Sequence, residues 1–242
     1  IRSQNANGAW SITNRSFFYK MAAGPSTTNS NIVAVEYFFD SDPGFGLATS
    51  VPITPNQNIV NLNFDADMTN IGFGVRNLYI RSKDANDVWS ITNRMFVCRD
   101  SMKILLQGFY EGGGLMTTTL MNQGIGSDMM ITDSIDVELH EINFPYNMVA
   151  SSKAILHTDG TFSCVFTQNI QDAMYYRVIK HRNSIETWSE TPIGFYASPH
   201  DFTTAASQVY ASNQTEVEAG VFAMYTGDIN QDGFIDSFDF PA

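Results

Sequence analysis

Charged residues are scarce in this chain, because Lys, Arg, Asp and Glu make up only 16% of its 242 residues. Basic residues are the scarcer kind, with 13 Lys and Arg against 25 Asp and Glu, which gives a formal net charge of −12. Nucleic-acid binding depends on basic side chains that neutralise phosphates, so this composition argues against a nucleic-acid partner. An acidic surface is better suited to divalent cations.

Long apolar runs are also missing. No stretch approaches the roughly 20 apolar residues that a membrane-spanning helix needs, so we expect no membrane insertion. The chain does not begin with Met and starts inside a repeated motif, so the lack of a signal peptide carries no information about export. Apolar residues still account for 43% of the chain, which predicts folded domains.

Cysteine is limited to Cys98 and Cys164, one in each of the two main units predicted below. Cys164 alternates with Phe162 and Phe166, which places the three side chains on one face of a strand. Two buried free thiols are therefore favoured over a disulfide bridge.

Recognisable catalytic motifs are absent from the sequence. It contains no Gly-x-Ser-x-Gly nucleophile elbow and no phosphate-binding loop, and its four His residues are scattered without metal-ligand spacing. The paired carboxylates that hydrolyse glycosides come together only in the folded protein, and nothing in the sequence singles out such a pair. The sequence therefore predicts a protein that is not an enzyme.

What the chain does contain is a long repeat. The segment Ile80–Arg94 recurs as Ile1–Arg15, and the two copies place Trp10 and Trp89 79 positions apart. A weaker third copy is centred on Trp188. Each copy indicates a strand, an Asx-rich turn and a return strand that starts with Trp. The shared register favours a framework role in the core for these Trp residues over a role as a ligand platform.

The pattern between the repeats predicts β-strands throughout. Residues 32–39 are rich in β-branched and aromatic side chains, and alternation indicates strands at 60–65, 135–139 and 162–166. Apolar residues of 202–209 follow helical spacing, which predicts one short helix. The expected fold class is all-β, with tandem immunoglobulin-like β-sandwich domains followed by a single dockerin-like calcium loop.

The repeats and linkers predict four segments. Residues 1–24 would be the closing hairpin of a preceding repeat plus a linker. Residues 25–100 would form an immunoglobulin-like β-sandwich repeat, and residues 101–226 a second, larger β-sandwich. Residues 227–242 would begin a dockerin-like calcium-binding loop.

The sharpest chemical pattern lies in that last segment. Oxygen ligands fall at positions one, three, five, nine and twelve of a twelve-residue loop, a spacing that wraps a hard cation. The candidate metal ligands are Asp228, Asn230, Asp232, Asp236 and Asp239 through their side chains and Phe234 through its backbone carbonyl. Gly233 stands at position six, where the turn needs positive φ. An acidic surface turn is the alternative, but four close carboxylates favour a neutralising Ca²⁺.

The loop departs from an ordinary EF-hand. Position twelve is Asp239 instead of Glu, and residues 220–225 before the loop are typical of a strand instead of a helix. In both respects the loop resembles the dockerin type. That family usually carries two such loops, whereas one is present here, which weakens any implied cohesin-binding role.

Most of the chain also resembles modules of large secreted surface proteins from Gram-negative bacteria that use the type 9 secretion route. Residues 36–46 and 83–90 carry the resemblance in the repeat, and residues 106–110, 178–184 and 227–233 carry it in the larger unit. The resemblance implies export to the extracellular space or outer cell surface, β-sandwich modules and a calcium loop. It implies no activity.

These observations predict a non-catalytic, calcium-binding β-sandwich segment of a secreted or cell-surface protein, acting as a stalk, spacer or adhesin part. Expected partners are calcium, and other surface proteins or glycans. The alternative is an accessory or carbohydrate-binding region of a secreted polysaccharide-degrading enzyme. A hydrolase whose site is assembled in space is a third hypothesis.

Overall fold

The structure is a computed structural model, and it describes residues 30–56, 59, 62–167, 170–195 and 199–239. Its regular structure is mostly β-strand, which confirms the predicted all-β class. The hairpin and linker predicted for residues 1–24 lie outside the described residues. No helix in the described ranges is long and apolar enough to cross a membrane.

A first sheet occupies the N-terminal part of the described chain. Its strands are β1 (Ile32–Phe39), β2 (Thr49–Val51), β3 (Gly74–Asp84) and β4 (Asn93–Lys103). β1 pairs antiparallel with β2 and β3, and β3 pairs antiparallel with β4. The register places Tyr37 opposite Ile80, and both contribute to a small apolar cluster on one face. β-branched and aromatic side chains suit this half-buried, pleated surface.

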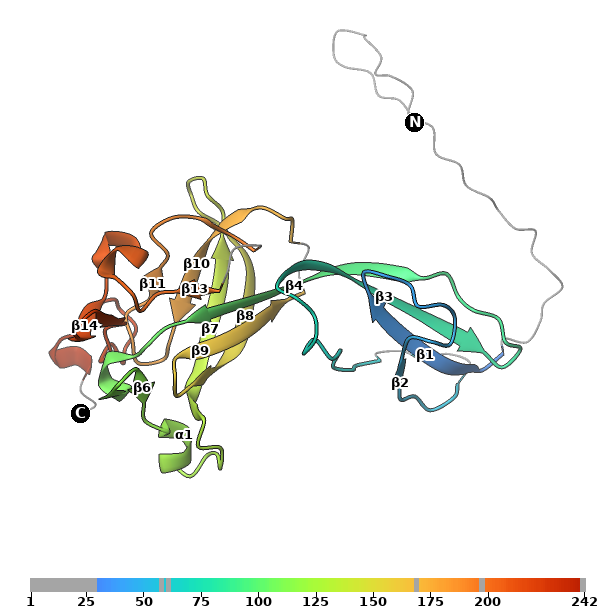
Figure 1. Cartoon of the computed structure of the whole chain (residues 1–242), viewed down its shortest axis with the longest axis horizontal. Helices are drawn as coiled ribbons and strands as arrows, with labels where there is room; N and C mark the ends of the chain where they lie inside the picture. The colour runs from blue at the N-terminus through green and yellow to red at the C-terminus, as the bar shows by residue number, and fades with distance from the viewer. Residues whose placement is uncertain (1–29, 57–58, 60–61, 168–169, 196–198, 240–242) are drawn as a thin grey trace, which may run out of the picture.

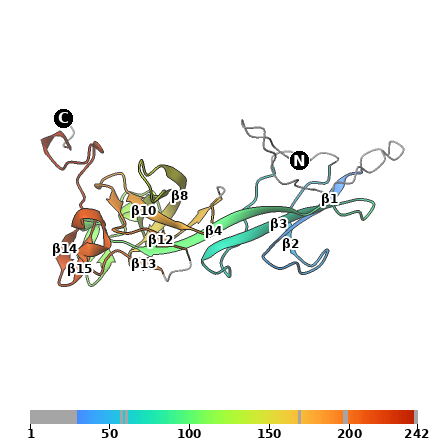
Figure 2. The ribbon, with the colours of Figure 1, turned by 90° about the horizontal axis from the view of Figure 1, so that it is seen from above.

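β4 continues beyond the first sheet into the larger, C-terminal part of the molecule (Figures 1 and 2). It pairs with β3 as far as Arg99, and from Cys98 to Lys103 it pairs with β9 (Thr161–Phe166). Because Cys98 and Arg99 have partners on both neighbours, β3 and β9 lie on opposite edges of β4. The predicted boundary between residues 100 and 101 thus falls inside one continuous strand. The division into two immunoglobulin-like domains stays a prediction.

A second sheet faces the far half of β4 and β9. Its strands are β7 (Ile131–His140), β8 (Met148–His157), β10 (Met174–Lys180) and β11 (Thr187–Trp188). They run in the order β11-β10-β7-β8 and are all antiparallel. The short strands β12 (Ile193–Gly194) and β13 (His200–Asp201) pair with β10 and with the end of β4.

The main apolar core lies between these two sheets. As predicted, the alternating residues of β7 and β9 point inward, and this confirms both strands. Met102 and Ile104 join them from the end of β4 and the residue after it. The inward residues of the two predicted strands are Ile135, Val137, Leu139, Phe162, Cys164 and Phe166, each at most 2% exposed.

Short elements complete the larger part. They are β5 (Tyr110–Gly112), β6 (Leu115–Met116), α1 (Thr119–Asn122), β14 (Thr215–Glu218) and β15 (Val221–Ala223). Single 3₁₀ turns cover Gln107–Phe109, Ala206–Gln208, Tyr210–Ser212 and Ser237–Asp239. The helix predicted within residues 202–209 is therefore wrong, since only a 3₁₀ turn forms there. Phe202 and Val209 are nonetheless fully buried, so the apolar spacing did identify core residues.

The strand predicted at residues 60–65 is also not found where the structure describes it. Residues 60 and 61 lie outside the described ranges, and residues 62–65 join no ladder. The alternation instead places Phe64, Ala66 and Met68 against the apolar face of the first sheet. The Phe64 ring centroid is 5.3 Å from that of Tyr37. An extended segment can bury alternate side chains on top of a sheet without pairing at its edge.

Candidate metal centre

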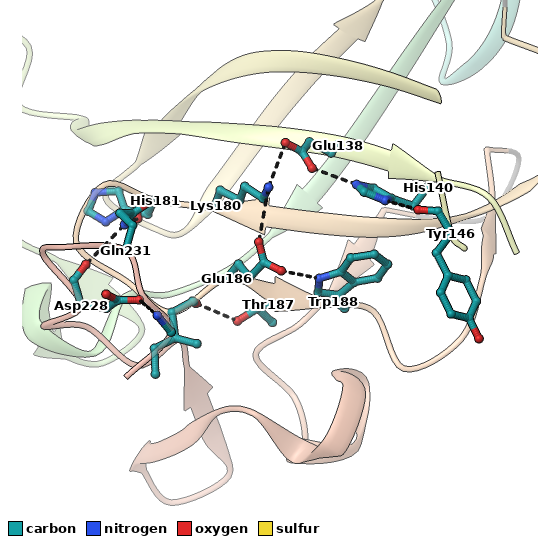
Figure 3. A network of polar contacts seen from close by, with 12 residues as sticks. Glu138, His140, Tyr146, Lys180, His181, Glu186, Thr187, Trp188, Asp228 and Gln231 are labelled. Carbon is teal, nitrogen blue, oxygen red and sulfur yellow. Dashed lines mark hydrogen bonds and ion pairs between the residues drawn. The ribbon is translucent and has the colours of Figure 1, made fainter. Parts of the chain in front are cut away.

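The predicted calcium loop follows β15 and is held against the turn between β10 and β11. Gly227 donates its backbone N–H to the carbonyl of Asn183 at 2.9 Å, and the Gln231 side chain donates to the carbonyl of His181 at 3.1 Å (Figure 3). Just before the loop, Ile185 N–H donates to the Tyr225 carbonyl at 3.1 Å. The loop is thus attached to the larger sandwich through backbone and side-chain bonds.

The first half of the loop folds around Asp228. Its carboxylate accepts the backbone N–H groups of Asp232 and Gly233 at 3.2 and 3.1 Å. The Asn230 side-chain oxygen accepts the same Asp232 N–H at 2.9 Å. Gly233 has φ of +86°, the left-handed conformation that the sixth position of such a loop requires.

The second half of the loop closes on Asp239. One oxygen of its carboxylate accepts the N–H groups of Ile229 and Asn230 at 2.8 and 3.2 Å, and the other accepts Asp236 N–H at 2.8 Å. These backbone donors, with that of Asp236 the strongest, lower the pKa of Asp239. Asp236 in turn accepts Phe238 N–H at 2.7 Å. The twelfth residue therefore joins the end of the loop to its beginning.

The loop carries negative charge without a basic partner. Asp228 is 2% exposed and Asp239 is 5% exposed, yet no ion pair to Lys, Arg or His involves them or the other two loop carboxylates within the described chain. A buried carboxylate is costly unless it is paired or binds a cation. Backbone N–H groups offset part of that cost but supply no net positive charge.

The ligand types fit Ca²⁺, but the side chains do not converge in this conformation. Among the described residues, no three His, Cys, Asp or Glu side chains are grouped so that they could hold a metal ion. The carboxylates are turned toward backbone amides instead of toward one another. Phe234, which is 71% exposed, has no oxygen in its side chain and could contribute only its backbone carbonyl. An all-oxygen donor set in this order suits a hard cation.

A buried polar network lies beneath the loop, and the sequence patterns did not identify it. His181 lies between Ser184, whose Oγ is 3.1 Å from Nδ1, and Asp133, whose carboxylate is 3.4 Å from Nε2. Arg182 donates to the same carboxylate at 2.7 Å. The three residue types match a Ser-His-Asp triad, but Ser184 is 3% exposed and follows His181 by three residues in one turn. The network joins the β10–β11 turn to β7.

A buried ion pair links the two sheets. Arg177 on β10 donates from Nε to the carboxylate of Asp100 on β4 at 2.7 Å. Its Nη1 donates to the carbonyls of Tyr175 and Ile193, and its guanidinium carbon lies 4.4 Å from the Phe195 ring centroid. The two charged residues are 1% and 8% exposed.

Two histidines, the buried His181 and the half-buried His200, give an expected pH dependence. Burial lowers the pKa of His181, against the opposing pull of Asp133, and burial with the nearby Arg177 lowers the pKa of His200. Between pH 7.5 and 5.5 the unfolded chain then binds more protons than the folded chain, so stability falls as pH falls through about 6.5. Urea unfolding at several pH values measures this loss. The pH slope should become shallower in His200→Gln, and an unchanged slope in that variant would contradict the assignment.

The two cysteines lie close together in the structure, although the sequence places them in separate predicted units. Cys98 is on β4 and Cys164 on the adjacent β9, two residue pairs apart in the ladder. Both thiols are free and at most 1% exposed. Burial raises the pKa of each thiol, so both are held in the protonated, unreactive form.

The Trp residues do not occupy the core, so their predicted core position is wrong for the two copies that are described, and their framework role stays a prediction. Trp89 and Trp188 are both only partly buried. Trp89 stacks on Phe45 at a centroid distance of 5.3 Å, and Arg81 lies beside both rings. Trp188 lies on the outer face of the second sheet. The remaining copy, which contains Trp10, lies outside the described residues.

The acidic residues near Asp42 and near Asp84 form Asx turns. Asp84 accepts the N–H groups of Asn86 and Val88 through one carboxylate oxygen, and Asp42 accepts that of Gly44. Asp42 also pairs with Arg81 at 2.9 Å. These carboxylates stabilise local turns, which is the usual role of Asx residues in such sequences.

No protein-family model, curated protein or solved structure was found to match the chain.

Proposed function

We propose that this chain is a non-catalytic segment of a secreted or cell-surface protein, built from β-sandwich structure and stabilised by Ca²⁺ at its C-terminal loop. One observation carries the proposal. Two almost fully buried carboxylates, Asp228 and Asp239, close a twelve-residue loop of oxygen donors and have no basic partner among the described residues. A divalent cation is the simplest source of the missing positive charge.

The residues that would hold the ion are those of the predicted ligand set. Asp228, Asn230, Asp232, Asp236 and Asp239 would contribute side-chain oxygens, and Phe234 would contribute its carbonyl. Bound Ca²⁺ supplies charge neutralisation and removes the mutual repulsion of the four carboxylates. Because Gly227 and Gln231 bond to the β10–β11 turn, ordering the loop would also hold that turn against the chain end.

A structural role fits the rest of the molecule. The continuous strand β4 couples the first sheet to the larger sandwich, which suits a stalk, spacer or adhesin part (Figure 1). The resemblance to type 9 secreted surface proteins supports an extracellular or outer-surface location. The dockerin-like loop supports the alternative, an accessory region of a polysaccharide-degrading enzyme.

Titration calorimetry with Ca²⁺ tests the proposal. The parent chain should bind one Ca²⁺ in this loop, and Asp232→Ala should lose that site because it removes the fifth-position ligand. Asp67→Ala is the matched control, since Asp67 accepts the backbone N–H of Thr69 in an Asx turn far from the loop. That control should keep the parent stoichiometry. Equal stoichiometry in Asp232→Ala and the parent would refute the calcium assignment.

Thermal unfolding supplies an independent measurement. At a free Ca²⁺ concentration 100 times the dissociation constant, binding should stabilise the folded chain by about 2.7 kcal/mol. Stabilisation by Ca²⁺ that persists in Asp232→Ala would place the ion elsewhere.

Limited proteolysis gives a further test. Chelation of Ca²⁺ should expose residues 228–239 to protease and leave the sandwich largely protected.

A further inference from the structure

An aromatic groove lies on the outer face of the second sheet, apart from the calcium loop. We call it the Trp188 groove and define it by the lining residues Tyr146, Tyr176, Glu186, Trp188, Ser189 and Tyr210. Its volume is about 390 Å³. A second hollow of about 540 Å³ shares Glu186, Trp188 and Tyr210 and continues past Asn213 to Tyr225. The two hollows therefore adjoin one another at these three residues.

The strand register explains why aromatic side chains gather there. Tyr176 on β10 lies opposite His140 on β7, and Val178 lies opposite both Glu138 on β7 and Trp188 on β11. Directly opposed residues share a face, so His140, Tyr176 and Trp188 all project to the outside of the sheet. Their ring centroids are close: 4.5 Å from Trp188 to His140 and 6.1 Å from Trp188 to Tyr176.

A chain of polar contacts fixes the Trp188 ring in place (Figure 3). Its Nε1 donates to Glu186 at 2.9 Å, and Lys180 lies between Glu186 at 3.3 Å and Glu138 at 3.1 Å. Glu138 is 2.8 Å from His140, which also contacts the carbonyl of Tyr146 at 2.7 Å. A ring held by neighbours on β7, β10 and the β10–β11 turn loses little freedom when a ligand packs on it.

The groove also presents polar atoms that have no protein partner. Tyr146 and Tyr210 are 42% and 65% exposed, and no hydrogen bond of their phenol oxygens, or of that of Tyr176, is found in the described part of the chain. A purely apolar ligand would bury these hydroxyls unpaired, at a cost. The preferred ligand therefore combines apolar faces for the rings with donors and acceptors for the phenols.

The charges around the groove narrow the chemical class of the ligand further. Among the described residues, neither hollow is lined by Lys, Arg or His, and Lys180 beside the groove is already paired with two carboxylates. Phosphates, nucleic acids and acidic polysaccharides would meet Glu186 without a free basic partner. A compact organic cation would need ring faces around one centre. Here Tyr146 and Tyr176 pack edge to face at 5.9 Å and 88°, which makes a wall instead of a cage.

We propose that the Trp188 groove binds a neutral oligosaccharide chain, with sugar C–H faces on Trp188 and Tyr210 and sugar hydroxyls bonded to the tyrosine phenols and Glu186. The two adjoining hollows accommodate more than one sugar unit. Tyr176 and Trp188 are placed by the second sheet, so this binding does not require calcium, although Glu186 lies in the β10–β11 turn that the loop contacts. It would give the chain a glycan-recognition role in addition to a structural one.

Calorimetry on the full chain with neutral hexasaccharides tests the proposal, using cellohexaose, maltohexaose, mannohexaose and chitohexaose as probes. At least one should bind saturably, and Trp188→Ala and Tyr210→Ala should each weaken that binding at least about tenfold. Tyr210 is largely exposed, so its variant decides the matter if Trp188→Ala fails to fold. Trp89→Ala is the matched control and should bind like the parent, since it removes the Trp at the same repeat position on the first sheet.

Three results would overturn the proposal. The first is no binding of any neutral hexasaccharide at millimolar concentration. The second is parent-like binding in Tyr210→Ala. The third is binding only of choline or of polygalacturonate, tested in parallel, because these probes report a cation cage or an anion site instead.

Discussion

Replacing Asp100 with Ala is expected to lower the free energy of unfolding by about 3–5 kcal/mol, because it leaves the Arg177 guanidinium buried without its counter-charge. Arg177 is 1% exposed, and within the described chain its Nη2 already lacks a hydrogen-bond partner. The remaining contacts are to two backbone carbonyls, which cannot neutralise the charge. Urea denaturation followed by far-UV circular dichroism measures the difference.

An exposed pair provides the matched control. Lys153 and Asp136 pair at 2.7 Å, but their side chains are 79% and 49% exposed. Asp136→Ala makes the same chemical change in water and should cost less than about 1 kcal/mol. Comparable losses in the two variants would mean that burial is not what makes the Asp100–Arg177 pair matter.

A double variant separates charge imbalance from lost packing. Asp100→Leu combined with Arg177→Met removes both charges and keeps apolar volume between the sheets. It should recover most of the stability that Asp100→Ala loses, since replacing a buried pair by apolar residues is often neutral or stabilising. A double variant as unstable as Asp100→Ala would show that the ion pair itself, and not the unpaired charge, determines the stability.

Local sequence patterns predicted the strands well because the alternation of apolar residues depends only on which face of a strand is buried. The alternation of Ile135, Val137 and Leu139 needs only one buried face, and the structure supplies it in β7. The same alternation at Leu62 and Phe64 predicted a strand that does not form. An alternation with a period of two residues shows which side chains are buried, but it does not show which backbone groups form hydrogen bonds. Ladder formation depends on a free sheet edge, which sequence does not reveal.

The continuity of β4 was not predictable for a related reason. Its two halves pair with β3, next to it in sequence, and with β9, some 60 residues later. A repeat motif that ends near Arg94 and a change of pattern after Arg99 indicated a boundary, whereas the partners on each edge decide where a strand stops. The placement of Cys98 and Cys164 on adjacent strands depends on the same long-range contact, so the sequence did not reveal it.

The candidate sites likewise divide into one that a local pattern predicts and others that depend on long-range contacts. All six calcium ligands come from one contiguous loop, so spacing alone could nominate them, and their metal binding stays a prediction. The His181 network joins the β10–β11 turn to β7, and the Trp188 groove draws residues from several elements, so no linear motif encodes either of them. One signal was present for the groove: Tyr176 and Trp188 stand at outward positions where a solvated strand would carry polar residues.

Gly160→Ala is expected to be strongly destabilising, because the position combines two constraints. Gly160 connects β8 to β9 with φ of +81°, in the left-handed region that costs a residue with a Cβ about 1–2 kcal/mol. A Cβ built there would lie 2.6 Å from the carbonyl oxygen of Ile104 and 3.0 Å from the Leu105 side chain. The Ile104 N–H also donates to the Gly160 carbonyl at 2.9 Å, so this contact cannot relax without breaking a bond.

Gly220 separates the two constraints. It has nearly the same φ, +75°, in the turn between β14 and β15, but nothing lies within 4 Å of the point that a Cβ would occupy, so Gly220→Ala should show the conformational cost alone. The crowded site should then lose a further 1–3 kcal/mol or so, the typical cost of overpacking, measured as the difference between the two variants in urea denaturation. Equal losses would mean that the Ile104 segment moves aside freely. A larger loss at Gly160 would follow from its position in the β8–β9 turn, because Ile104 and Leu105, which directly follow β4, pack against that turn.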